Sequence, residues 1–162
     1  MVTRKKRYWL FKSEPDAYSI DMMEKDGVEP WDGIRNYQAR NLLRDEIKLG
    51  DGVLFYHSRV APMAVVGVCE VVEEGSPDET QFDPESRYFD PKSDPDDPRW
   101  YWVRIRFREK FARPVTLQEI KADPRLQDMM LVRKGSRLSI QPVSVEEWRH
   151  IVKLGRRKKS KT

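Results

Sequence analysis

The segments "PMAVVGVCEVVEE", residues 62–74, and "WYWVRIRFREKF", residues 100–111, carry the two strongest strand signals in the chain. Both are rich in the branched and aromatic residues that favour extended backbone. In the second segment, Arg104, Arg106 and Arg108 alternate with mostly apolar residues, as expected for a strand with one buried face. The first segment alternates only weakly, which indicates burial on both faces or membership of a closed barrel.

Weaker signals on both sides complete the pattern. Further strands are expected at residues 8–12, at residues 53–57 after a Gly-Asp-Gly turn, and in "SRLSIQPV", residues 136–143. Helices are expected near residues 19–27, 36–47, 116–120 and 144–155, with candidate capping residues Asp21, Asn36, Thr116 and Ser144 and candidate stops at Gly27 and Gly155. No series of βαβ crossovers is visible. The sequence therefore predicts an α+β fold, a small, mostly antiparallel β-barrel with flanking helices.

Length and composition suit one domain. The chain has 162 residues, and its five Trp, six Tyr and six Phe can build a core although 36% of the residues are charged. No apolar run is long enough for a membrane span, and the N-terminus lacks the features of a secretory signal. The only cysteine is Cys69, which favours a reducing compartment. We expect a monomer in the cytoplasm, or in the nucleus if the source is eukaryotic.

The charge is unevenly distributed along the chain. Residues 1–7 and 156–162 carry nine basic residues and no acid, which is more than the whole net charge of +4. The body, residues 8–155, is therefore net acidic, and residues 78–98, here called the acidic loop, hold eight acids against two bases. We interpret the two ends as basic tails suited to loose contact with nucleic acid, or to solubility alone, and residues 8–155 as the single domain.

Residues with common catalytic or metal-binding chemistry are few. His57 and His150 are far apart, and Cys69 lies in a Val-rich strand, where a thiol usually packs as a small apolar group. One Cys and two distant His cannot form a zinc site. No phosphate-binding loop or dinucleotide-binding fingerprint is present. The sequence therefore predicts no catalytic residue, no metal and no cofactor.

Aromatic, amide and hydroxyl residues gather at strand ends and in the segment "WDGIRNYQARN", residues 31–41. Planar aromatic rings stack on nucleobases, each stack contributing about 1–3 kcal/mol. Amides and hydroxyls hydrogen-bond to base edges. The candidates are Lys12, Ser13, Trp31, Asn36, Tyr37, Tyr56, His57, Ser58, Ser139, Gln141 and Pro142. From the residues alone, a platform for a base and a cover over the end of the barrel explain this set equally well.

The chain resembles the EVE domain over residues 8–153, in six segments that follow in the same order: "YWLFKSEPDAYSIDMMEKDG", "WDGIRNYQARN", "GDGVLFYHS", "VVGVCEVVEE", "DDPRWYWVRIRF" and "SRLSIQPVSVEEW". The resemblance implies a PUA-like fold, related to the YTH, ASCH and SRA domains. YTH domains hold N6-methyladenine in RNA, and SRA domains hold a flipped 5-methylcytosine in DNA, each in an aromatic pocket. It therefore implies a non-catalytic domain that recognises a modified base in DNA or RNA.

The related YTH pattern also implies where such a pocket would lie. It suggests Lys12, Ser13 and Trp31 as pocket residues. YTH domains place a second tryptophan in the loop that corresponds to the acidic loop, which has no Trp in this chain. The candidates for the opposite wall are instead Phe82, Tyr88 and Phe89. The candidates for phosphate contacts, besides the basic tails, are Arg35 and Arg40.

Two other functions remain open at this point. One is an enzyme or a binder of a nucleoside-like small molecule that uses the same pocket; a His57 side chain facing away from Trp31 would argue against the enzyme. The other is a protein-interaction module that uses the acidic loop. Because binding to phosphates needs local positive charge, we expect the acidic loop to lie away from the pocket mouth and Arg and Lys to line that mouth.

Overall fold

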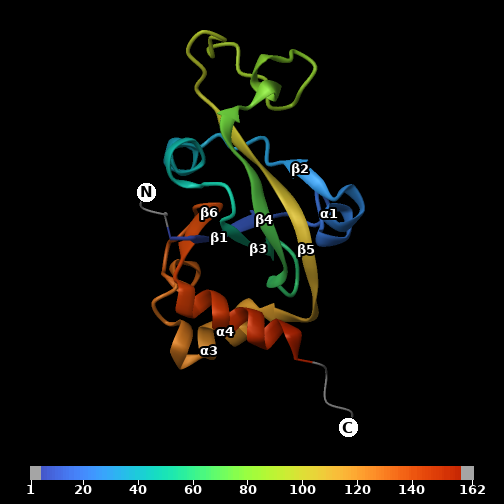
Figure 1. The fold of residues 1–162 in the computed structure, drawn as a ribbon, viewed down its shortest axis with the longest axis vertical. Coiled ribbons are helices and arrows are strands. Elements are labelled where there is room, and N and C mark those ends of the chain that lie inside the picture. Colours follow the sequence, from blue (N-terminus) through green and yellow to red (C-terminus); the bar gives the residue numbers. More distant parts are fainter. Residues whose placement is uncertain (1–4, 158–162) are drawn as a thin grey trace.

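A six-stranded mixed sheet forms the centre of the computed structural model, which describes residues 5–157 (Figure 1). The strands are β1 (Tyr8–Ser13), β2 (Val28–Pro30), β3 (Gly52–His57), β4 (Ala64–Pro77), β5 (Tyr101–Thr116) and β6 (Ile140–Val143). The α-helices are α1 (Ile20–Asp26), α2 (Tyr37–Asn41), α3 (Leu117–Ala122) and α4 (Val145–Arg156). The α+β class is confirmed. Of the predicted basic tails, residues 1–4 and 158–162 lie outside the described part of the chain.

The strand order is β2-β5-β4-β3-β1-β6, and every neighbouring pair is antiparallel except β1 with β3. The expectation of a mostly antiparallel sheet is therefore confirmed. In this order β2 and β6 are free edges, so the hydrogen-bonded strands do not close into the predicted barrel. The sheet contains a single crossover rather than a series: the chain between the parallel strands β1 and β3 crosses over through α1, β2 and α2.

The longest pair is β4 with β5, the two strands that the opening segments predicted. Their pairing runs from Ala64 opposite Thr116 to Pro77 opposite Tyr101, with register shifts at four points that let the strands bend. Both strands are longer than predicted because pairing continues past the apolar segments. The acidic loop projects from the far end of this pair, whereas α3 and α4 pack at the opposite end (Figure 1).

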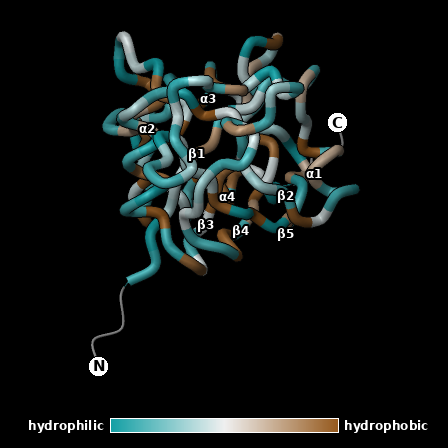
Figure 2. Tube along the Cα trace, turned by 90° about the horizontal axis from the view of Figure 1, so that it is seen from above, coloured by the Kyte–Doolittle hydropathy of each residue, from teal (hydrophilic) through white to brown (hydrophobic). Residues whose placement is uncertain are grey.

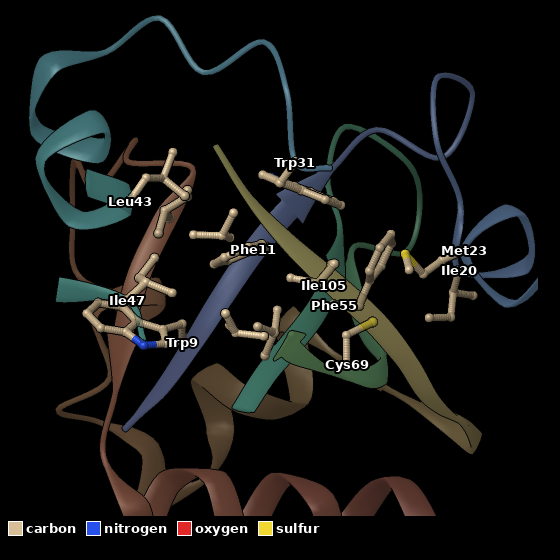
Figure 3. Close-up of a cluster of buried hydrophobic side chains, with 14 of the residues drawn as sticks. Trp9, Phe11, Ile20, Met23, Trp31, Leu43, Ile47, Phe55, Cys69 and Ile105 are labelled. Carbon is tan, nitrogen blue, oxygen red and sulfur yellow. The ribbon is translucent and has the colours of Figure 1, made fainter. Parts of the chain in front are cut away.

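Alternating residues of the strands fill two hydrophobic clusters. Along β1, Trp9 and Phe11 lie in one cluster together with Trp31, and Leu10 lies in the other. Figure 3 shows the first cluster, in which Trp31 lies above Phe11 at the end of β1. The second cluster is covered by α4, which contributes Ile151. Hydrophobic residues gather along the strands and at α4, whereas the chain around α2 is mostly hydrophilic (Figure 2).

Helix caps follow the sequence closely. The predicted caps of α2, α3 and α4 each accept a hydrogen bond from a backbone N–H in the first turn, and the capping box of α4 is complete. The exception is α1, whose cap is Ser19 rather than Asp21. The predicted stop of α1 at Gly27 is confirmed.

The described residues contain no candidate metal site and no candidate membrane-spanning helix. Within residues 5–157, no group of three or more His, Cys, Asp or Glu side chains could hold a metal ion. None of the helices described there has the length and apolar character needed to cross a bilayer. Burial raises the pKa of the Cys69 thiol to about 12, so this cysteine is a protonated core residue and not a nucleophile.

Gly155 was predicted to end α4, but it lies inside the helix. Its lack of a side chain lets the helix approach β5. A Cβ at this position would lie 2.2 Å from Cδ2 of Phe111. Alanine favours a helix interior by about 1 kcal/mol relative to glycine, but overpacking costs about 1–3 kcal/mol.

We therefore expect Gly155→Ala to lower the free energy of unfolding in urea by about 1–2 kcal/mol. Lys153→Ala, on the exposed face of the same helix, should change it by less than about 0.5 kcal/mol. A stabilised Gly155→Ala would contradict this account.

His57 makes stability depend on pH. Its Nε2 accepts a hydrogen bond from the backbone N–H of Ile20 at 3.1 Å, which requires an unprotonated nitrogen. Burial lowers the pKa of His57, nearby Lys110 lowers it further and Asp21 opposes the shift. The unfolded chain therefore binds this proton more readily than the folded chain does. The contribution of His57 to stability is complete above its ordinary value of 6.5 and is lost as the pH falls through its lowered folded value.

We expect the melting temperature of the natural chain to fall below about pH 6.5 more steeply than that of His57→Gln. The glutamine amide oxygen can accept the same hydrogen bond but does not titrate. Thermal unfolding followed by circular dichroism between pH 7.5 and 5 measures the difference. Parallel curves for the two proteins would show that His57 contributes nothing to the pH dependence.

Candidate functional site

A pocket of about 410 Å³ opens beside Trp31 at the end of β1. Its lining comes from the ends of β1 and β2, from the segments that follow them, and from the acidic loop. The lining residues are Lys12, Ser13, Glu14, Ala17, Tyr18, Glu29, Pro30, Trp31, Asp32, Gly33, Ile34, Arg87 and Tyr88. The pocket thus combines three aromatic side chains with five charged ones. Its volume lies within the range of about 300–1,000 Å³ that is typical of small-molecule sites.

Trp31 both packs in the core and lines the pocket. Only 8% of the residue is exposed, and its ring centroid lies 5.3 Å from that of Phe11 and 5.6 Å from that of Phe55. Tyr18 meets it edge to face at 6.4 Å. Its backbone N–H donates to the carbonyl of Val103 at 2.8 Å. These contacts fix the indole, so the pocket has a rigid inner wall.

Tyr88 forms the outer wall. Its ring lies over Gly33, where an added Cβ would be 2.5 Å from Cζ of Tyr88. Gly33 also has a φ of 78°, a conformation that favours glycine. The other two loop candidates do not line this pocket: Phe82 is half-buried, and Phe89 is 40% exposed.

The fully buried carboxylate of Asp78 joins the two walls. It accepts hydrogen bonds from the backbone N–H of Gly33 at 2.9 Å, from Arg35 Nη1 at 3.1 Å and from the backbone N–H of Thr80 at 2.8 Å. Arg35 also donates to the Tyr88 carbonyl through Nη2 at 2.7 Å. Arg35, a predicted phosphate contact, therefore uses its guanidinium to hold the acidic loop.

The polar groups of the pocket lie in a partly desolvated space. Desolvation lowers the pKa of Lys12. Desolvation raises the pKa of Glu29, with Asp26 and Asp32 adding to the shift. Desolvation likewise raises the pKa of Asp32, where the main addition comes from Asp78. In all three cases the first cause is desolvation, which penalises a charged group in this space.

The second half of the WDGIRNYQARN segment turns away from the pocket. Asn36 caps α2 through its Oδ1. Tyr37 stacks on Trp100 with ring centroids 4.9 Å apart and remains 52% exposed. The Arg40 guanidinium lies over the Tyr37 ring, 4.9 Å from its centroid, and donates to the Arg99 carbonyl at 2.7 Å. None of the three candidates lines the Trp31 pocket.

The strand-end candidates divide in the same way. Lys12 and Ser13 line the pocket, and the Ser13 hydroxyl donates to the Tyr18 carbonyl at 2.5 Å. Tyr56 is buried in the second hydrophobic cluster. His57 is occupied by its hydrogen bond from α1 and does not line the pocket, which argues against the enzyme hypothesis.

The remaining candidates act through the backbone or from other surfaces. Ser58 donates its N–H to the Ser13 carbonyl at 2.9 Å, and the Ser139 carbonyl accepts the N–H of Lys12 at 2.9 Å. Gln141 is buried on β6, and Pro142 is half-buried beside it. Of the thirteen lining residues, only Lys12, Ser13, Trp31 and Tyr88 were predicted. The nine others lie close in sequence to a predicted residue, and among them Tyr18, Glu29, Asp32 and Arg87 carry polar groups into the lining.

The expectation that the acidic loop lies away from the pocket mouth is wrong. The loop contributes Arg87 and Tyr88, although none of its carboxylates lines the pocket. The mouth is also not dominated by Arg and Lys. Its two cationic side chains are accompanied by the three carboxylates of Glu14, Glu29 and Asp32.

The family model of the EVE domain matches residues 7–154. Mouse thymocyte nuclear protein 1 is 38% identical over 91% of this chain and 73% of its own length. The crystal structure of a Pseudomonas putida protein is 43% identical with a TM-score of 0.87, covering 91% of this chain and 98% of that one. The crystal structure of human THYN1 protein in complex with 5-methylcytosine-containing DNA is 34% identical with a TM-score of 0.87, covering 94% and 99%. The chain therefore belongs to the EVE domain family.

Proposed function

We propose that this chain is a non-catalytic nucleic-acid-binding domain that holds a modified base between Trp31 and Tyr88. The observation that carries the proposal is the pocket: two aromatic walls from different parts of the chain enclose partly desolvated polar groups. A nucleobase is flat and uncharged, which matches such a space. The human relative crystallised with 5-methylcytosine-containing DNA makes 5-methylcytosine the first base to test.

The polar lining suits the edge of a cytosine. The exocyclic amino group of cytosine donates hydrogen bonds, and Asp and Glu side chains accept them. Asp32 and Glu29 supply such acceptors, and Lys12 supplies a donor for the ring nitrogen or the carbonyl oxygen of the base. A base within a duplex must be flipped out to enter a pocket of this kind, whereas a single-stranded base need not be.

Selectivity for the methyl group should be modest. Methylation at C5 adds apolar area without removing a donor or an acceptor from the pairing edge. Burial of one methyl contributes about 1 kcal/mol, which corresponds to roughly fivefold in affinity. The aromatic walls, each contributing about 1–3 kcal/mol by stacking, should therefore decide whether a base binds, and the methyl group should only adjust the affinity.

We expect Tyr88→Ala to weaken binding of a 5-methylcytosine oligonucleotide by roughly 5- to 150-fold, because one aromatic wall is lost. Phe89→Ala is the matched control: it removes a neighbouring aromatic of the same loop that does not line the pocket, and it should leave affinity unchanged. Fluorescence anisotropy measures both. Mass spectrometry of the recovered oligonucleotide should show an unchanged base, which distinguishes a reader from an enzyme. Equal affinities for the two variants would refute the pocket.

A glycine pair tests the position of the same wall. We expect Gly33→Ala to push the Tyr88 ring outwards and to weaken oligonucleotide binding. Gly27→Ala introduces alanine at the same φ of 78° but with no atom within 4 Å of the new Cβ. Both variants should lose about 1–2 kcal/mol of stability from backbone strain, as measured in urea, but only Gly33→Ala should lose affinity. Similar affinities for both would mean that the Tyr88 position is unimportant.

A further inference from the structure

A second hollow, of about 430 Å³, lies next to the segment that carries Trp31. It is lined by Asn36, Gln38, Met130, Arg133, Lys134, Gly135, Ser136, Arg137 and Leu138. Three of these residues are cationic, and none is acidic. All three cationic residues come from residues 133–137, "RKGSR", here called the basic loop. This surface therefore has an excess of positive charge, whereas the base pocket has more carboxylates than cations.

The cations of the basic loop are available to a ligand. Arg133, Lys134 and Arg137 are all exposed. Within residues 5–157, none of the three forms an ion pair with a carboxylate. The Arg133 side chain donates a hydrogen bond from Nη2 to the carbonyl of Asp128 at 3.2 Å. Arg35, by contrast, is held by the buried Asp78.

Backbone and side-chain contacts fix the basic loop close to the base pocket. The buried Gln141 of β6 donates through Nε2 to the Leu138 carbonyl at 2.9 Å and to the Ser136 hydroxyl at 3.2 Å. The carbonyl of Ser139 accepts a hydrogen bond from the backbone N–H of Lys12, and Lys12 lines the pocket. The basic loop is thus attached to the end of β1 at which the pocket opens. Asn36, which also lines the hollow of the basic loop, lies five residues after Trp31 in the sequence.

We propose that the basic loop binds the phosphodiester backbone of the strand whose base enters the Trp31 pocket. This inference rests on the proposed function and adds the missing phosphate contacts to it. Exposed Arg and Lys side chains bind phosphates through charge and N–H donation, and each contact releases counterions from the nucleic acid. The Ser136 hydroxyl lines the same hollow and can donate to a phosphate oxygen.

A cationic hollow on α4 provides the alternative. It is about 460 Å³ in volume and is lined by Trp148, Arg149, Val152, Lys153, Arg156 and Arg157. Helix α4 lies at the end of the molecule opposite the acidic loop (Figure 1), and the acidic loop supplies the outer wall of the base pocket. Arg156 is also paired with Glu109. A nucleic-acid strand held on α4 would therefore lie at the opposite end of the molecule from the acidic loop that supplies one pocket wall (Figure 1).

The test compares two double variants with the same loss of charge. Lys134→Gln with Arg137→Gln removes two cations from the basic loop, and Lys153→Gln with Arg149→Gln removes two from α4. Affinity for one oligonucleotide with 5-methylcytosine and for its unmethylated counterpart is measured by fluorescence anisotropy from 50 to 300 mM salt. Melting temperatures confirm that both variants fold.

We expect the basic-loop variant to bind both oligonucleotides roughly tenfold more weakly at 50 mM salt. The slope of log affinity against log salt should become shallower by about 2, because each of the two removed cations no longer neutralises a phosphate. The ratio between methylated and unmethylated affinities should not change, and the α4 variant should behave like the natural chain. An unchanged salt slope for the basic-loop variant, or an equal loss of affinity for the α4 variant, would overturn the proposal.

The same data separate this proposal from the proposed function. If Tyr88→Ala binds as tightly as the natural chain while the basic-loop variant loses affinity and salt dependence, the base pocket fails and the basic loop stands as a backbone-binding site. If Tyr88→Ala loses affinity while the basic-loop variant keeps the natural salt slope, the base pocket stands and the basic loop fails.

Discussion

The buried carboxylate of Asp78 is the constraint on which the candidate site depends. A carboxylate without solvent is stable only when hydrogen bonds and a cation compensate its charge, and here Arg35, Thr80 and the backbone of Gly33 do so. These partners belong to two segments that are more than forty residues apart. Satisfying this one charge therefore brings the segment of Trp31 against the acidic loop, and Arg35 extends the link to the backbone of Tyr88. The two walls of the pocket are positioned by one polar network.

The sequence predicts the local features of the fold well. The strands of residues 62–74 and 100–111 and the helix caps at Asn36, Thr116 and Ser144 all depend on neighbours within a few residues, which a pattern can reveal. The parallel pairing of β1 with β3 was missed because it joins strands that are separated by two helices and a short strand. Nothing in the local pattern of either strand specifies its partner.

The candidate site was predicted only in part, for a related reason. Trp31 is recognisable because a tryptophan in a polar segment is unusual. Arg35 was predicted to contact phosphate because nothing close to it in the sequence indicates its carboxylate partner. That partner, Asp78, lies 43 residues away. Asp32 and Glu29 have no periodicity that would point to a pocket, and their significance comes from the desolvation that only the folded chain imposes.

The net acidic body, at first sight unfavourable for nucleic-acid binding, is consistent with a division of charge. A base is neutral, and it can enter a space in which desolvation penalises charge, as the shifted pKa values of Lys12, Glu29 and Asp32 indicate. A phosphate is anionic and needs exposed cations instead, such as those of the basic loop. Positive charge at the pocket mouth would favour phosphate entry and compete with the base. Because the base pocket and the basic loop are separate surfaces, one can bind the base and the other the phosphate of the same nucleic-acid strand.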